Sequence, residues 1–153
     1  MDPYDSSAVR KVWERVRLCH EQLLSSMIAE ETQVRDFFRR LGGQRTPLRR
    51  DFLSIAAQEE QHLRQLQELY RKSFGTEPPA ERLPPLKYGS LPQALSAQRE
   101  KALARARSYQ KAAVHFSANS ELFLSLSHEE ELLAQRLQDL WQRQRPPHRA
   151  YKP

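Results

Sequence analysis

The chain has 153 residues, and its 25 Lys and Arg against 19 Asp and Glu give a formal charge of +6 and a pI near 9.8. This length suits one domain that buries a core unaided, and the single cysteine, Cys19, excludes an intrachain disulfide framework. No apolar run approaches the length of a membrane span, and the opening MDPYDSSAVRK lacks the apolar core of a signal peptide, so we expect a cytoplasmic protein without a membrane segment.

A long first helix is predicted over about residues 7–41, where apolar residues recur mostly at spacings of three and four. The segment DSS at residues 5–7 offers N-cap side chains, and the pair Gly42-Gly43 is expected to end the helix. The first two turns carry an apolar stripe that extends beyond what a second helix of ordinary length would cover. We therefore expect a homodimer through this stripe. It consists of Val9, Val12, Trp13 and Val16.

Three further helices and one long connection follow. A second helix is predicted over about 48–73, and its short connection to the first makes the two helices antiparallel neighbours. The segment at about 75–92 holds five of the ten prolines, so it cannot be helical throughout and is long enough to cross the length of a bundle. A third helix at about 93–115, a fourth at about 120–144 and a basic tail at 145–153 complete the chain. No strand pattern appears.

The two halves of the chain are similar to each other. When the sequence is shifted by 71 residues, HLRQLQELY at residues 62–70 falls on LAQRLQDLW without a gap. The same shift places Glu59 on Glu130, so each half carries a carboxylate at the same depth. Two hairpins joined by one crossover have the connectivity of a ferritin-like bundle. We therefore predict an all-α, ferritin-like four-helix bundle that forms a single domain over residues 1–153.

Glu59 and His62 form a Glu-x-x-His pattern on the second predicted helix. Three residues turn a helix through about 300°, so the two side chains lie within about 60° of each other and can bind one ion. Glu60 points elsewhere. Such pairs are also common in charged helices that bind no metal, and the neighbouring acidic residues fit a solvated surface.

Over residues 8–144 the chain resembles the rubrerythrin branch of the ferritin-like superfamily. In that family the first and third helices each carry a Glu followed seven residues later by an aromatic residue. The second and fourth helices each carry Glu-x-x-His, and together these side chains hold two metal ions. The first half of the chain matches this pattern, with Glu31 seven residues before Phe38 and with Glu59-x-x-His62.

The second half departs from the family pattern at two positions. Ala102 stands in place of the third-helix Glu, and Leu133 stands in place of the His that should follow Glu130. In the family these two ligands belong to the same ion, so the resemblance implies that a ligand set for the other ion survives. That set is Glu31, Glu59, His62 and Glu130. Glu100 or His128 could replace a missing ligand if a π-bulge rotated it into place.

The surviving donors are moderately hard and suit iron, manganese or zinc, and the resemblance favours iron or manganese. Three carboxylates facing a bundle core would lose hydration and repel one another, so a divalent ion would stabilise them. The resemblance implies a role in metal handling or oxidative stress. Whether the chain is an enzyme stays open. An active chain would be an iron-dependent, peroxidase-like oxidoreductase, but no catalytic residue is assigned, and a single cysteine excludes the CxxC pairs of a rubredoxin-type electron donor.

A metal-free interaction module is the alternative. A ferritin-like bundle that has lost its ions would keep remnants such as Glu59-x-x-His62. Basic residues at both ends of the first predicted helix could attract nucleic acid or an acidic partner, although they also fit the solvated surface of an arginine-rich bundle. These residues are Arg10, Lys11, Arg15, Arg17, Arg39, Arg40, Arg45, Arg49 and Arg50.

Overall fold

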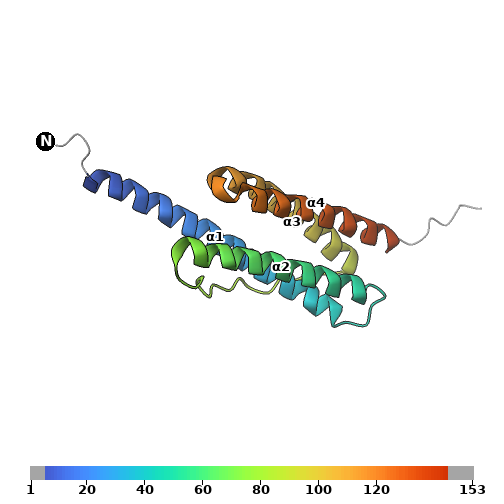
Figure 1. The fold of residues 1–153 in the computed structure, drawn as a ribbon. Coiled ribbons are helices and arrows are strands. Elements are labelled where there is room, and N and C mark those ends of the chain that lie inside the picture. The colour runs from blue at the N-terminus through green and yellow to red at the C-terminus, as the bar shows by residue number, and fades with distance from the viewer. Residues whose placement is uncertain (1–5, 145–153) are drawn as a thin grey trace, which may run out of the picture. The chain divides into compact units, whose positions relative to one another are not determined.

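The computed structural model describes residues 6–144, and the predicted basic tail at 145–153 lies outside these residues, as does Asp5. The chain divides into two compact units, Met1–Leu86 and Lys87–Pro153. Within residues 6–144 the structure consists of four α-helices, one short 3-10 helix and no strand, which confirms the predicted all-α class (Figure 1). Each unit contains one helical hairpin, called here the first and the second hairpin. No helix within the described part of the chain combines the length and apolar character needed to cross a bilayer.

The first hairpin pairs α1 (Ser6–Gly42) with α2 (Arg49–Phe74). Both helices bury one apolar stripe, as their spacing of three and four predicts. α1 ends at Gly42, which confirms that the pair Gly42-Gly43 ends the helix. A Cβ there would lie 2.5 Å from Leu53 Cδ2, so Gly42 permits the close approach of the two helices at the turn.

The N-terminal part of α1 extends beyond the end of α2 (Figure 1). Arg17 marks the point where the overlap ends, because its Nη2 donates a hydrogen bond of 3.4 Å to the carbonyl of Phe74. Its guanidinium carbon also lies 5.9 Å from the centre of the Phe74 ring. Residues 6–16 therefore project past α2, as the sequence predicts. The apolar side chains on this projection are exposed, and they are Val9, Val12, Trp13 and Val16.

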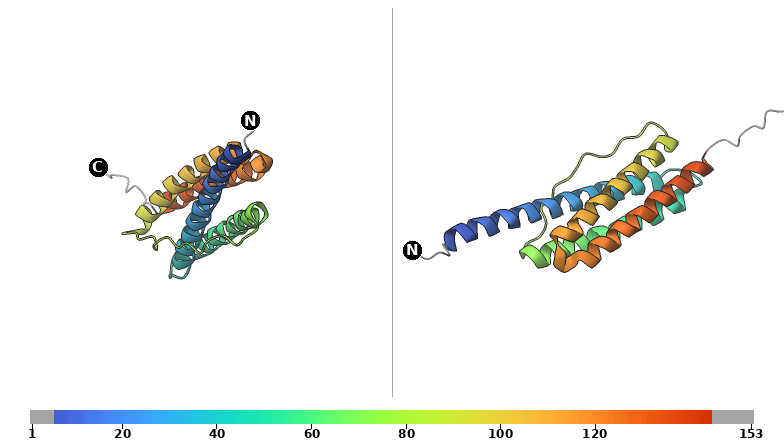
Figure 2. Two further views of the ribbon diagram at one scale, coloured as in Figure 1. Left: turned by 90° about the vertical axis from the view of Figure 1, so that its left-hand side faces the viewer. Right: turned by 90° about the horizontal axis from the view of Figure 1, so that it is seen from above.

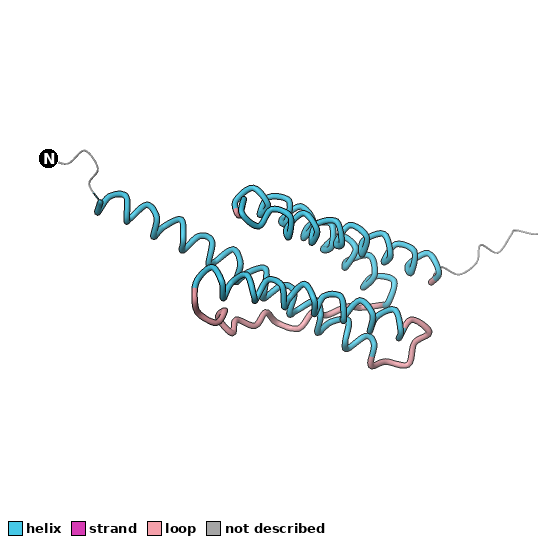
Figure 3. The backbone as a smooth tube through the Cα atoms, in the orientation of Figure 1, coloured by secondary structure: helices cyan, strands magenta, loops and turns pink. Residues whose placement is uncertain are grey.

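The crossover between α2 and the next helix returns along the first hairpin (Figure 3). It begins at Gly75, whose φ of 72° is the left-handed conformation that commonly ends a helix. Gln33 then donates to the carbonyl of Pro84 over 2.7 Å, and Arg40 donates to the carbonyl of Leu86 over 2.9 Å. Because Arg17 contacts Phe74 just before the crossover and Arg40 contacts Leu86 near its end, the crossover runs along the part of α1 that pairs with α2.

The second hairpin pairs α3 (Leu91–His115) with α4 (Ser120–Arg143), and the short 3-10 helix η1 (Ser117–Asn119) joins them. The two helices run side by side along their length (Figure 2). α3 begins two residues before the predicted limit of 93 because Ser90 caps it, accepting a hydrogen bond from the Gln93 amide. The other helix ends lie within two residues of prediction.

The internal repeat is visible as matching ring contacts within each hairpin. In the first, the rings of Phe38 and Phe52 lie 6.1 Å apart with their planes at 35°. In the second, the equivalent rings of Tyr109 and Phe123 lie 6.3 Å apart at 31°. Since α3 and α4 are regular α-helices without a π-turn over their described length, the second hairpin keeps the register that the shift of 71 residues predicts.

Candidate metal centre

Glu31 lies in the middle of the buried stripe of α1 and is fully buried. It lies three residues after Ile28 and three before Val34, and both of these apolar residues are also buried. Its neighbour Glu30 is exposed. The helical period therefore selects one of two adjacent glutamates for the interior.

On α2, too, one of two adjacent glutamates is buried: Glu59 lies in the interior and Glu60 does not. Glu59 and His62 have relative exposures of 0% and 1%. His62 Nδ1 lies 3.6 Å from Glu59 Oε2. Glu60 instead forms an ion pair with Arg35 at the edge of the hairpin, where both side chains are partly exposed to solvent.

The first hairpin brings three of the predicted ligands together. One ligand atom from each of Glu31, Glu59 and His62 lies within 4.8 Å of the other two. Two ligands on opposite sides of one ion, each at about 2.1–2.2 Å, are about 4.3 Å apart. Small side-chain adjustments would thus let these three residues bind a single ion.

Charge and burial favour a cation at this cluster. Two carboxylates that are buried close together lose hydration and repel each other, which raises the free energy of the fully ionised pair. A divalent ion would offset both costs. Two carboxylates and one imidazole nitrogen form the kind of donor set that binds iron, manganese or zinc, so the residues present fit such an ion.

Glu130, the fourth predicted ligand, belongs to α4 of the second hairpin and is fully buried. Arg105 on α3 donates a hydrogen bond of 3.1 Å from Nε to Glu130 Oε2, and its Nη2 lies 3.1 Å from the same oxygen. Nearby, Ser127 donates to the carbonyl of Ala106 over 2.9 Å. The place of Glu130 beside the other three ligands is part of the proposal below.

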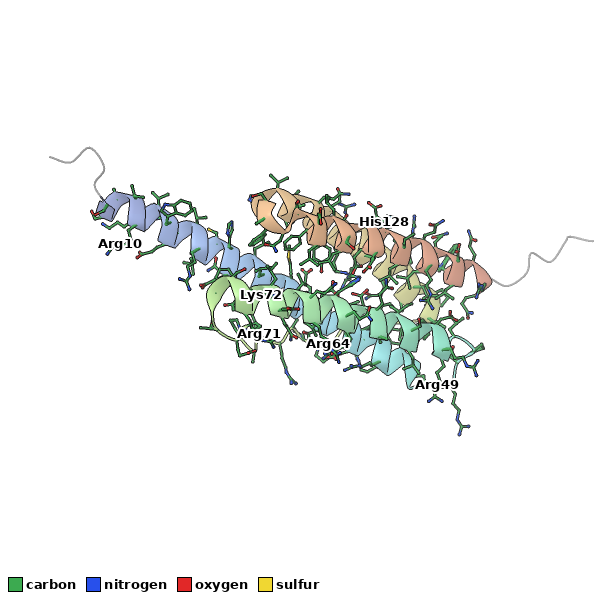
Figure 4. The ribbon with its side chains drawn as sticks, in the orientation of Figure 1. Arg10, Arg49, Arg64, Arg71, Lys72 and His128 are labelled. Carbon is green, nitrogen blue, oxygen red and sulfur yellow. The ribbon has the colours of Figure 1, made fainter. Side chains whose placement is uncertain are left out.

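The positions that lack a family ligand are apolar and buried. Ala102 has a relative exposure of 0% and Leu133 of 2%. The reserve ligands Glu100 and His128 are exposed, and Figure 4 shows His128 on the surface of α4. Because no π-turn occurs in the described parts of α3 and α4, neither residue is rotated toward the buried face.

Arg105 is the one residue of this region that the sequence reasoning missed. An arginine carries little signal in a chain with 25 Lys and Arg. The repeat could have found it, because the shift of 71 residues places Arg105 on Val34. Val34 is buried with 1% exposure, so the equivalent arginine was to be expected in the interior, where it needs an acidic partner.

The basic residues at the two ends of α1 lie on the surface, where Arg10 and the α2 residue Arg49 extend outward (Figure 4). Some of this charge has a structural use. Arg40 binds the crossover at Leu86, and Arg35 binds Glu60. These contacts account for part of the arginine content without a polyanion.

Comparison of the chain with models of known protein families, with curated proteins and with solved structures finds no match. The expectation of a rubrerythrin-type chain therefore depends on the residues and spacings of this chain alone.

Proposed function

We propose that this protein is a ferritin-like bundle of rubrerythrin type that binds one divalent metal ion, iron or manganese, in its core. The observation that carries the proposal is the buried cluster of Glu31, Glu59 and His62. Three ligands that suit such an ion, two carboxylates and one imidazole, come from two helices, and their ligand atoms lie within 4.8 Å of one another.

In this proposal Glu130 completes the ligand set. It occupies the position in the second hairpin that Glu59 occupies in the first, and it is buried in the same way. If the two hairpins pack with their equivalent buried faces together, as in a ferritin-like bundle, the two carboxylates approach the same ion. The proposed site then has three carboxylates and one imidazole.

Such an ion would supply a Lewis acid and, for iron or manganese, a one-electron redox centre. The chain's own residues hold it and exclude water, since all four side chains are buried. A single ion lacks the second electron source of a two-metal site, and the chain lacks CxxC pairs. We therefore favour metal handling or protection from oxidative stress, located in the cytoplasm, over reductive peroxide catalysis.

The alternative is a metal-free scaffold that serves as an interaction module. The ion pair of Arg105 with Glu130 favours it, because this pair neutralises one of the buried carboxylates without a metal. Under this alternative the three remaining ligands would be a remnant, and one or more of them would be protonated in the folded protein.

Elemental analysis of the full chain, produced with iron and manganese available, tests the proposal. We expect about one equivalent of metal in the parent and little in His62→Ala or Glu31→Gln. The matched controls are His128→Ala and Glu30→Gln, which alter exposed residues of the same types and should keep the metal. A parent without metal, or equal metal content in the site and control variants, would overturn the proposal in favour of the scaffold.

A further inference from the structure

The two hairpins differ in the charge of their interiors. Among residues 6–144, the buried acidic and basic side chains of the first hairpin are Glu31, Glu59 and His62. Those of the second hairpin are Arg105 and Glu130. The first interior thus holds two acids and a neutral or cationic imidazole, whereas the second holds one acid and one permanent cation. In the second hairpin the buried acid and the buried cation contact each other.

The Arg105 side chain is buried and contacts Glu130. Its relative exposure is 6%, and two of its nitrogens lie 3.1 Å from the same carboxylate oxygen. Removing a guanidinium from water costs several kcal/mol unless the charge is paired and hydrogen-bonded. An arginine at this depth therefore persists because it meets a carboxylate there.

The repeat shows which residue of the first hairpin is equivalent to Arg105. Under the shift of 71 residues it occupies the place of Val34, one helical turn after Ala102. The second hairpin thus differs from the first at three related positions: it lacks the ligands equivalent to Glu31 and His62, and it gains a cation beside the remaining carboxylate. Loss of an ion and gain of a guanidinium at one site leave the local charge balanced.

We propose that Arg105 takes the place of a second metal ion, so that its guanidinium neutralises Glu130 and closes the second position to metal. This inference rests on the proposed function for its one-ion stoichiometry. The role of Arg105 toward Glu130 can be tested without any metal. Arg105 is a positioning residue in this scheme, because it acts on the site through Glu130.

Restoring the missing ligands tests whether Arg105 excludes the second ion. The variant Ala102→Glu/Leu133→His returns both family ligands to the second hairpin but keeps Arg105. The triple variant adds Arg105→Val, which copies Val34 of the first hairpin. We expect about one equivalent of metal in the double variant and about two in the triple variant. Two equivalents in the double variant, or one in a triple variant that folds like the parent by circular dichroism, would overturn the exclusion.

Thermal unfolding of protein treated with EDTA tests the pairing independently. Arg105→Met leaves a buried carboxylate without its guanidinium, and we expect the Tm to fall by about 10 °C. Adding Glu130→Gln should recover part of this loss, because the uncompensated charge is gone. A double variant that is less stable by the sum of the two single losses would show that the pair is not coupled and would overturn the inference. A parent without metal would overturn the proposed function alone, since this measurement does not depend on metal.

Discussion

Arg35 Nη1 on α1 donates a hydrogen bond of 2.7 Å to Glu60 Oε2 on α2. The preceding residue, Glu59, is fully buried and belongs to the ligand cluster. Two adjacent glutamates therefore have separate uses, one in an ion pair that joins the helices and one in the candidate metal centre. Their separation makes Glu60 a probe of helix pairing that does not alter a ligand.

Glu60→Gln should weaken the first hairpin at neutral pH. Burial of Glu60 opposes its ionisation, but the hydrogen bond and charge of Arg35 and the neighbouring arginines outweigh this effect and hold the pKa of Glu60 below its ordinary value. The ionised form therefore stabilises the fold. This contribution is complete above the ordinary Glu pKa of about 4.3 and is lost as the pH falls through the lower pKa of the folded protein.

We expect Glu60→Gln to lower the free energy of unfolding by about 1 kcal/mol at pH 7 and by much less near pH 3. Urea unfolding at the two pH values measures the difference. Metal content should not change. An equal loss at both pH values would mean that the ion pair is not the source of the stability.

Glu31→Gln should stabilise the metal-free protein while abolishing its response to metal. Replacing one of the clustered carboxylates with a neutral amide removes mutual repulsion, which we expect to raise the free energy of unfolding by about 1 kcal/mol after EDTA treatment. The parent should gain stability when iron or manganese is added, and the variant should not. Thermal unfolding with and without metal measures both effects. The exposed neighbour Glu30→Gln serves as the control and should behave like the parent.

Phe52→Ala and Phe123→Ala test whether the two hairpins form one domain. Both rings have an exposure of 0%, so each truncation should cost about 3–5 kcal/mol. A single helical hairpin buries too little apolar surface to be stable alone. We therefore predict one cooperative urea transition in the parent that either variant shifts as a whole. Two transitions, with each variant shifting only one, would contradict the single bundle.

Trp13→Glu tests the homodimer that we propose for the apolar stripe of α1. Trp13 has an exposure of 68% on the part of α1 that projects past α2. Burying this stripe against a second copy would remove its apolar surface from water, and a charge there would oppose association. Light scattering at micromolar concentration should give a dimer for the parent and a monomer for the variant. Val114→Glu, at an exposed valine on α3, should leave the mass unchanged.

Much of the fold could be predicted from the sequence because its helices have clear periodicity and clear end signals. The four predicted helices lie within two residues of the observed ones. The largest error is at the start of α3, where Ser90 forms a cap that the prediction did not use. The role of Gly42 was also missed, because the close approach of Leu53 depends on how two helices pack and not on local sequence.

The site could be predicted in part. The helical period explains why Glu31 and Glu59 are buried while the adjacent glutamates, Glu30 and Glu60, are not. Arg105 could not be found by the same reasoning, since a motif search looks for ligands and not for a cation that replaces one. The contact of its guanidinium with Glu130 shows that the buried carboxylate of the second hairpin is paired with a cation.

The projection of α1 past Phe74 gives one continuous helix two levels of local stability. Backbone amides of residues 6–16 are protected only by the hydrogen bonds of their own helix, because the side chains around them are exposed. Those near Glu31 can exchange with solvent only when the buried core opens. In the monomeric variant Trp13→Glu, trypsin should therefore cut at Arg10, Lys11 or Arg15 and leave the ligand cluster intact. The surface proposed for self-association could thus be removed by proteolysis without loss of the candidate metal centre.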